Sequence, residues 1–464
     1  MAALNSIDDT IMALATASGA GAIAVIRISG KEAFAITDKV FKSKGKKTAS
    51  KAESHTIIFG DIVDRNELVD EVLISVFRNP KSFTGEDSVE ISCHGSTFIQ
   101  KRILNLLSRN GCRMAKPGEY TMRAFMNRKM DLSQAEAVAD LIASSSEAAH
   151  KVAMHQMRGG FSSELKVLRE ELIHFASLIE LELDFSEEDV EFADRSQMIE
   201  LINRIISTID RLIGSFELGN VIKEGVQVAI IGEPNAGKST LLNALLNEER
   251  AIVSDIAGTT RDTVEDELVI EGIKYRFIDT AGIRQTTDTI ESLGIERTMK
   301  KAEQADVVMF LFDASTYSSE QLKSEISELK KGKSDLESRL ILVANKTDKA
   351  LESITKKFAE FDTVSISAKE KTGIEELTSR LTDFVNLSAL KEDQTIVTNT
   401  RHIQALSDAK NSLLEVLTGF ENQMSGDLVA IDIRKSLFHL GEITGEITTD
   451  DLLGNIFSKF CIGK

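Results

Sequence analysis

Hydrophobic and polar residues alternate in short runs along the first part of the chain. Alternation with a period of two is typical of strands that bury one face, and it predicts strands over 22–28, 56–62, 72–77 and 89–92. Helical spacing over 98–108 stops at the turn pair Asn110-Gly111. Residues 1–120 are therefore predicted to form an α+β domain.

Beyond this segment the apolar positions take the spacing of amphipathic helices. Helices are predicted over 132–142, 165–179 and 197–216, with Gly159-Gly160 as a break between the first two. Helical spacing returns from Arg401 onward. We expect 121–220 and 385–464 to form one helical domain interrupted by an insertion, although periodicity alone equally allows two separate helical domains.

The intervening segment, 221–384, has the pattern of an α/β domain. Largely apolar runs predict strands at 226–231, 275–278, 307–312, 340–344 and 364–366. Strands that are apolar throughout are typical of parallel sheets covered by helices on both faces. The ends of such strands are where α/β proteins bind their ligands, so the residues that follow each run deserve inspection.

The first of these runs leads into the pattern GxxxxGKS, from Gly232 to Ser239. Glycines let successive backbone N–H groups converge on phosphate oxygens, and the helix that follows adds its positive N-terminus. In such a loop Lys238 neutralises the β and γ phosphates, and the Ser239 hydroxyl is a ligand for Mg²⁺. We expect nucleotide contacts from Asn235, Ala236, Gly237, Lys238, Ser239 and Thr240.

Later strand ends carry motifs that favour GTP over ATP. In Asp279-Thr280-Ala281-Gly282, Asp279 is placed to hold Mg²⁺ through water, and Gly282 to approach the γ-phosphate. In Asn345-Lys346-Thr347-Asp348, Asp348 can accept two hydrogen bonds from guanine, a donor pair that adenine lacks. The last motif, expected to close over the base, is Ser367-Ala368-Lys369.

A hydroxyl-rich loop without strand or helix periodicity lies between the first two motifs. It comprises Ser254, Asp255, Ile256, Ala257, Gly258, Thr259 and Thr260. Thr260 is expected to complete the Mg²⁺ site when GTP is bound. Ile283 stands where Ras-like enzymes have a glutamine, so another group must orient the attacking water.

These motifs predict that 221–384 is a Ras-like α/β P-loop GTPase domain inserted in a multidomain α+β protein. Its 464 residues carry a formal net charge of -18, which offers no general attraction to nucleic acid or membranes. Any nucleic acid substrate then needs a local patch or a partner. Three widely spaced cysteines and the absence of a long apolar run favour a reducing, cytoplasmic location with no membrane contact.

Together with the GTPase motifs, further motifs along nearly the whole chain make it resemble the MnmE (also TrmE) family of tRNA-modification GTPases. They are Phe83-Thr84-Gly85-Glu86-Asp87, Pro117-Gly118-Glu119, Asp131 to Ala137, Gly258 to Asp262, Glu442 to Glu446, Asp450 to Gly454 and Cys461-Ile462-Gly463-Lys464. The resemblance implies a homodimer with a folate-binding N-terminal domain that also dimerises. It further implies a heterotetramer with an FAD-dependent, MnmG-like protein. Together such proteins install an aminomethyl or carboxymethylaminomethyl group on carbon five of the wobble uridine of certain tRNAs, with methylene-tetrahydrofolate as carbon donor.

The resemblance also assigns residues. It implies folate contacts at Arg27, Glu90, Lys129 and Lys464, where cationic groups suit folate carboxylates and Glu90 suits the pterin ring. It implies that K⁺ replaces a trans-supplied arginine, in a cage formed by the Asn235 side-chain oxygen and the carbonyls of Ser254, Ile256 and Thr259. Glu291 matches the family's catalytic glutamate, which orients the attacking water.

Two other functions stay open at this point. A GTP-controlled ribosome-assembly factor of the Era or Der type would carry an RNA-binding KH-type domain or a second GTPase domain, and the sequence has the pattern of neither. A folate enzyme regulated by GTP is harder to set aside. Cys461 lies beside the core-like Phe457 and Phe460, so we expect it to be a buried packing residue.

Overall fold

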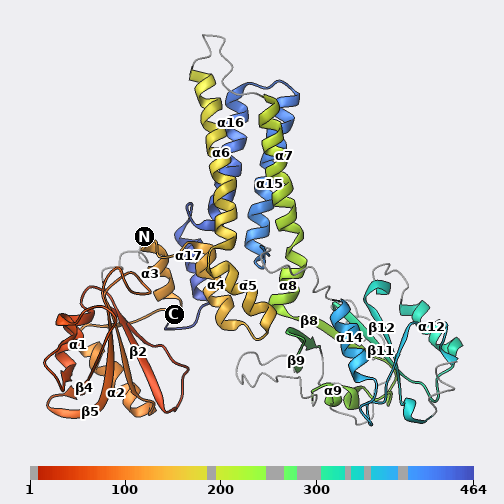
Figure 1. The fold of residues 1–464 in the computed structure, drawn as a ribbon, viewed down its shortest axis with the longest axis horizontal. Helices are drawn as coiled ribbons and strands as arrows, with labels where there is room; N and C mark the ends of the chain where they lie inside the picture. Colours follow the sequence, from red (N-terminus) through yellow and green to blue (C-terminus); the bar gives the residue numbers. More distant parts are fainter. Residues whose placement is uncertain are drawn as a thin grey trace. The chain divides into compact units, whose positions relative to one another are not determined.

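The computed structural model describes residues 9–184, 195–246, 266–278, 305–329, 336–349, 357–384 and 395–463. Contacts divide the chain into two compact units. One comprises Met1–Ala139, Gln156–Ile206 and Gln404–Lys464, and the other comprises Asp140–His155 and Ser207–Ile403. Figure 1 shows the elements of both. Among the described residues, no helix has the length and apolar character needed to cross a membrane.

The first unit begins with a sheet in the order β3-β4-β5-β6-β2-β1-β7. Its strands are β1 (Ile11–Leu14), β2 (Ile23–Ser29), β3 (Phe41–Ser43), β4 (Thr56–Asp64), β5 (Glu67–Phe77), β6 (Ser88–His94) and β7 (Arg113–Met114). Helices α1 (Ala33–Val40) and α2 (Thr97–Arg109) bury residues such as Ile36 and Leu107 in a common core with the sheet. The predicted strands and the helix at 98–108 are thereby confirmed, whereas β1, β3, β7 and α1 are new.

A buried arginine joins α3 (Glu119–Met126) to the sheet. Arg123 is 1% exposed, and its Nη atoms lie 2.5 Å from Asp9 Oδ1, 3.2 Å from Glu86 Oε1 and 3.0 Å from Glu119 Oε1. Burial by itself raises the pKa of the Asp9 and Glu119 carboxyls, but hydrogen bonds from Arg113 and Arg123 outweigh it and hold both pKa values below their usual range. The cluster is therefore charged at neutral pH.

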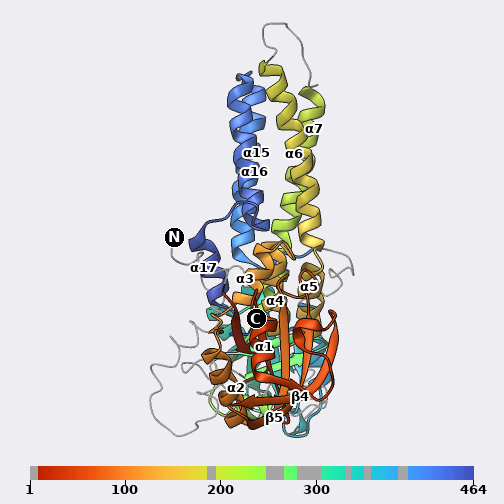
Figure 2. The same cartoon turned by 90° about the vertical axis from the view of Figure 1, so that its left-hand side faces the viewer.

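The helical part of this unit comes from sequence on both sides of the nucleotide motifs. It contains α4 (Leu132–Ala143), α6 (Gly160–Asp184), α7 (Arg195–Gly214), α15 (Thr400–Glu421), α16 (Gly426–Thr444) and α17 (Asp450–Ser458). Figures 1 and 2 show α6 beside α16 in one bundle with α7 and α15. The Arg169 guanidinium donates to the Leu437 carbonyl at 2.5 Å, and the Phe175 and Phe420 rings pack edge to face. One discontinuous helical domain, not two separate ones, is confirmed.

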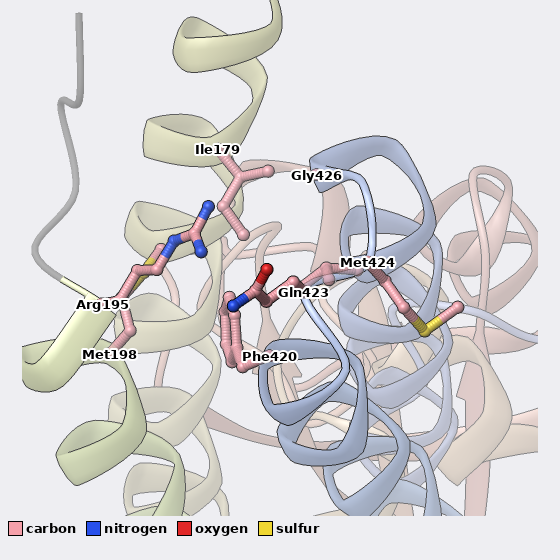
Figure 3. A pocket seen from close by; sticks show the side chains of 8 residues that line it. Ile179, Arg195, Met198, Phe420, Gln423, Met424 and Gly426 are labelled. Carbon is pink, nitrogen blue, oxygen red and sulfur yellow. The ribbon is translucent and has the colours of Figure 1, made fainter.

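A small cavity of about 190 Å³ lies in the bundle where α15 gives way to α16. Its walls include the apolar side chains of Ile179, Met198 and Phe420 (Figure 3). Arg195 and Gln423 add polar groups to the same cavity.

The C-terminal helix α17 packs on the beginning of α4. Leu453 and Phe457 form an apolar cluster with Leu132 and Ala135. Because α17 ends at Ser458, Cys461 lies beyond the helix and is exposed, while its carbonyl accepts a hydrogen bond from Gly118 at 3.3 Å. The expectation that Cys461 is a buried packing residue is therefore wrong.

The second unit contains a sheet in the order β13-β12-β11-β8-β10-β9. The strands are β8 (Val226–Ile231), β9 (Asp266–Ile270), β10 (Ile273–Phe277), β11 (Val307–Asp313), β12 (Leu340–Asn345) and β13 (Thr363–Ser365). All neighbouring pairs are parallel except β9 with β10. The helices are α5 (Glu147–Met157), α8 (Phe216–Glu224), α9 (Lys238–Leu246), α12 (Ser319–Leu329) and α14 (Ile374–Phe384).

Strand β11 shows why the apolar runs of this segment are continuous. Met309 and Leu311 belong to the core cluster on one face of the sheet, whereas Phe310 and Phe312 belong to the cluster on the other face. A strand covered on both faces needs apolar residues at every position. The predicted strands of 221–384 are confirmed, and the short antiparallel β9 is new.

We expect Arg123→Ala to lower the free energy of unfolding of the N-terminal sheet by about 3–5 kcal/mol, because Glu86 loses the guanidinium it pairs with, and Asp9 and Glu119 keep only that of Arg113. Hydrogen exchange of the β2 and β6 amides in the full chain would measure the loss. Arg102→Ala is the matched control, since Arg102 pairs with the exposed Glu67, and it should cost about 1 kcal/mol or less. Equal losses in the two variants would contradict the role given to burial.

Candidate functional site

The parallel strands of the second unit bring the predicted nucleotide motifs to one edge of the sheet. The phosphate-type loop Gly232 to Ser239 follows β8, and the Asn345 to Asp348 motif begins at the last residue of β12. The Ser367-Ala368-Lys369 motif follows β13. Carboxyl ends of neighbouring parallel strands meet at the same edge, so motifs far apart in sequence become neighbours.

The phosphate-type loop is shaped by close backbone approaches. Gly237 has φ +102°, and a Cβ there would lie 2.3 Å from Asn345 Nδ2. Gly232 has φ +144°, and a Cβ there would lie 2.0 Å from the Leu311 carbonyl oxygen. Only glycine fits at these two positions. The loop then leads directly into α9, whose N-terminus faces the place where phosphate binds in such loops.

Lys238 lies over this loop. Its Nζ donates to the carbonyl oxygens of Gly232 at 2.7 Å and Glu233 at 2.8 Å. The ammonium group is thus held at the loop, where phosphate oxygens of a nucleotide would meet it. Ser239 follows in the first turn of α9 and is partly buried, a position that suits a hydroxyl ligand of Mg²⁺, and Thr240 is exposed next to it.

Asn345 connects three of the predicted motifs. Its side chain is 2% exposed; Nδ2 donates to the Ala236 carbonyl at 2.8 Å, and Oδ1 accepts from the Ala368 N–H at 3.0 Å. The buried amide therefore ties the phosphate-type loop to the Ser367 to Lys369 loop. The amide of asparagine carries a donor and an acceptor on one short side chain, so a single residue can make both contacts.

Asp348 is exposed and oriented by a buried hydroxyl. Ser367 Oγ donates to Asp348 Oδ1 at 2.7 Å, and Ser367 itself is fully buried. Thr347 is also buried, and its N–H donates to the Ile366 carbonyl at 3.2 Å. Lys369 is exposed. A carboxylate held this way at a strand end can accept hydrogen bonds from an incoming base.

Several predicted site residues lie outside the described residues. They are Ser254, Asp255, Ile256, Ala257, Gly258, Thr259, Thr260, Asp279, Thr280, Ala281, Gly282, Glu291 and Lys464. Of the residues predicted to hold K⁺, Asn235 is described; it is exposed and has φ +66°. Of the residues predicted to hold Mg²⁺ directly, Ser239 is described.

In the N-terminal sheet, Arg27 and Glu90 are brought together by strand register. The two residues are directly opposite on β2 and β6, and Arg27 Nη2 lies 2.8 Å from Glu90 Oε1. Their side chains are 21% and 27% exposed. The guanidinium also lies 5.7 Å from the ring centres of both Phe83 and Tyr120. The result is a partly exposed ion pair whose guanidinium is close to two aromatic rings.

Lys129 belongs to the same neighbourhood through the loop that carries Phe83. Its Nζ donates to the Pro80 carbonyl at 2.9 Å, and Asn127 Nδ2 donates to the Thr84 carbonyl at 2.7 Å. A folate has its pterin ring and its carboxylates at opposite ends. The sequence analysis assigned Arg27 to the carboxylate end of a folate and Glu90 to its pterin end. Because the two side chains form an ion pair, they suit the same end of such a ligand.

Three residues escaped the sequence analysis. Phe83 stood in a recognised motif but its contact with Arg27 was not foreseen, and Tyr120 donates through its hydroxyl to the Arg27 carbonyl at 2.8 Å. Asp313, the last residue of β11, pairs with Lys346 at 2.7 Å. Its position at the end of an apolar strand was the one available signal.

Comparison with known proteins covers nearly the whole chain. The family models for the TrmE N-terminus and the MnmE helical domain match residues 10–129 and 132–461. The tRNA modification GTPase MnmE of Flavobacterium johnsoniae is 60% identical, over 98% of this chain and 99% of the relative. The protein of the same name from Cytophaga hutchinsonii is 59% identical, over 98% of each chain.

Among solved structures, Era in complex with MgGDPNP and nucleotides 1506–1542 of 16S ribosomal RNA shares 28% identity with this chain. It covers 40% of this chain and 66% of its own, with a TM-score of 0.26. The two MnmE relatives extend through the N-terminal sheet, the helical segments and the segment with the nucleotide motifs. With its GTPase motifs at one sheet edge and its N-terminal and helical parts both matched, the chain belongs to the MnmE family of tRNA modification GTPases.

Proposed function

We propose that this GTPase, together with an FAD-dependent MnmG-like partner, modifies carbon five of the wobble uridine of certain tRNAs. The product carries an aminomethyl or carboxymethylaminomethyl group, and methylene-tetrahydrofolate donates the carbon. The observation that carries the proposal is the 60% identity to an MnmE protein over 98% of the chain, which includes the parts outside the GTPase segment. A ribosome-assembly factor of the Era or Der type would instead carry a KH-type domain or a second GTPase domain, and the sequence has the pattern of neither.

In the proposed nucleotide site the loop from Asn235 to Thr240 binds phosphates, with Lys238 supplying positive charge. Ser239 and Thr260 ligate Mg²⁺, and Asp279 holds it through water. Asp348 reads guanine, supported by the hydrogen bond from Ser367 that orients its carboxylate. The remaining contacts come from Ser254 to Thr259, Thr280 to Gly282, Asn345 to Thr347 and Ser367 to Lys369.

We further propose that K⁺ assists hydrolysis and that Glu291 orients the attacking water. The exposed side chain of Asn235 is available to donate an oxygen ligand, since the contact described for this residue engages its backbone carbonyl. The other ligands would be carbonyls of Ser254, Ile256 and Thr259. A bound cation beside the β and γ phosphates offsets the charge that develops in the transition state.

The folate is proposed to bind at the Arg27 and Glu90 pair. A partly exposed ion pair beside two aromatic rings suits a pterin, whose polar edge can exchange hydrogen bonds with a carboxylate and a guanidinium. Lys129 and Lys464 then serve the carboxylate end. When bound, the folate supplies the one-carbon unit, and the residues of this chain hold and orient it.

The domain scheme follows the same proposal. Residues 1–120 bind folate and dimerise, 121–220 and 385–464 form the helical domain, and 221–384 form the GTPase domain. The assembly is a cytoplasmic homodimer that joins the MnmG-like partner as a heterotetramer. A net charge of -18 disfavours direct tRNA binding over most of the surface, so the partner is expected to hold much of the tRNA.

Transfer RNA from a strain that lacks this gene should contain wobble uridines without the carbon-five substituent, which nucleoside mass spectrometry would detect. Restoring the gene should restore the modified nucleoside. Normally modified tRNA in the deletion strain would reject the proposed function. A ribosome-assembly defect alongside normal tRNA would support the alternative function instead.

Arg27→Ala should abolish most of the binding of 5-formyl-tetrahydrofolate in calorimetry, because it removes a cation and frees Glu90 from its pairing. We expect at least a tenfold weaker affinity, about the effect of losing one charge-assisted hydrogen bond. Arg102→Ala removes a guanidinium from the same domain and should bind as the unaltered protein does. If Arg27→Ala retained full affinity, Arg27 would not belong to the folate site.

Hydrolysis should be faster in K⁺ than in Na⁺ at equal ionic strength, and Glu291→Ala should lose hydrolysis while it keeps GTP affinity. The two measurements are steady-state phosphate release and binding of a slowly hydrolysed GTP analogue. Equal rates in both salts would remove K⁺ from the mechanism. Undiminished hydrolysis by Glu291→Ala would remove that residue from catalysis.

A further inference from the structure

Lys346 lies between two groups from different parts of the GTPase domain. Its Nζ lies 2.7 Å from Asp313 Oδ2 and donates to the Asn235 carbonyl oxygen at 2.9 Å. The side chains of Asp313 and Lys346 are 17% and 30% exposed. One ammonium group thus joins the end of β11, the motif after β12 and the loop after β8.

Asp313 is itself held in place. The N–H and the hydroxyl of Ser315 donate to Asp313 Oδ1 at 3.0 and 2.6 Å, and the Ala314 N–H donates to the Asn345 carbonyl at 3.0 Å. Burial raises the pKa of the Asp313 carboxyl, but the contacts with Lys346 and Ser315 outweigh this effect and lower it below its usual value. The carboxylate is therefore charged at neutral pH and has one fixed orientation toward Lys346.

The hydrogen bond from Lys346 is accepted by a residue with an unfavourable backbone conformation. Asn235 and Lys346 both have left-handed backbone conformations, with φ +66° and +63°. Residues other than glycine adopt this region at a cost and keep it where surrounding contacts enforce it. A hydrogen bond between two such residues is a contact of that kind.

We propose that Asp313 is a positioning residue of the nucleotide site. By fixing the Lys346 ammonium on the Asn235 carbonyl, it locks the phosphate-binding loop to the guanine-binding loop and slows the release of nucleotide. The inference rests on the proposed nucleotide site, and it adds a residue outside the nucleotide-binding motifs. Asp313 has no contact with the nucleotide in this role and acts only through Lys346.

The test is the dissociation rate of a fluorescent GDP derivative from the full chain. Asp313→Asn should release it about tenfold faster, the change expected from losing one charge-assisted hydrogen bond. Asp362→Asn is the matched control, because Asp362 pairs with Arg380 on the exposed surface of the same domain. That variant should release the nucleotide at the unaltered rate.

A double-mutant cycle separates positioning from a general structural effect. If Asp313 acts through Lys346, adding Asp313→Asn to Lys346→Met should not accelerate release further. Rates that multiply in the double variant would overturn the proposal, as would an unchanged rate in Asp313→Asn. Should Asp313→Asn fail to fold, Ser315→Ala, which frees the Asp313 carboxylate to rotate, should give a smaller acceleration, and no acceleration would again overturn it.

Nucleotide selectivity of the unaltered chain distinguishes failure of the Asp313 proposal from failure of the proposed nucleotide site. If the unaltered chain releases guanine and adenine nucleotides equally fast, the proposed guanine site fails. If the unaltered chain is selective for guanine, and Asp313→Asn releases the nucleotide at the same rate as the unaltered chain, only the role of Asp313 fails.

Discussion

The GTPase site depends on the contact between the loop after β8 and the motif after β12. Parallel strands bring these segments to one edge, but a glycine-rich loop has many conformations of similar energy. Asn345 selects one of them, because its buried amide donates to the Ala236 carbonyl while it accepts from Ala368. An unpaired amide buried at this depth would cost about 1–3 kcal/mol, so the three segments keep their arrangement together or lose it together.

In the N-terminal domain, a buried charged side chain holds separate segments together. Arg123 holds α3 against the start of β1 and the segment before β6 through carboxylates that burial alone would not tolerate. Tyr120, one turn before Arg123 on α3, donates a hydrogen bond to the Arg27 carbonyl, and its ring lies beside the Arg27 guanidinium. The Arg123 cluster thus fixes the helix from which Tyr120 contacts Arg27 of the candidate folate pair.

Local patterns predicted much of this architecture, and long-range contacts account for what they missed. The strand over 226–231 and the motif at Asn345 to Asp348 follow from periodicity and short spacing, and both are present where predicted. The Asp313 pair with Lys346 and the ring of Tyr120 beside Arg27 join residues 33 and 93 positions apart, which no local spacing encodes. Likewise, periodicity identified the helices near 165–179 and 401 onward, but only their packing showed that they form one domain. Cys461 was misassigned because the helical pattern was extended past Ser458, where α17 ends.

The distribution of charge shows how an acidic protein can handle an anionic ligand. A net charge of -18 repels nucleotides at long range, yet that repulsion is screened beyond about 8 Å at physiological ionic strength. Within that distance nearby charged groups determine the interaction with a nucleotide. Here Lys238 and Lys346 both donate hydrogen bonds to carbonyl oxygens of the phosphate-type loop. Protein carbonyl oxygens thus hold both cations at the loop, which limits the side-chain entropy that nucleotide binding has to overcome. A ligand as extended as tRNA spreads its phosphates over many Debye lengths of acidic surface, so a short-range arrangement of this kind cannot offset the net charge along its whole length.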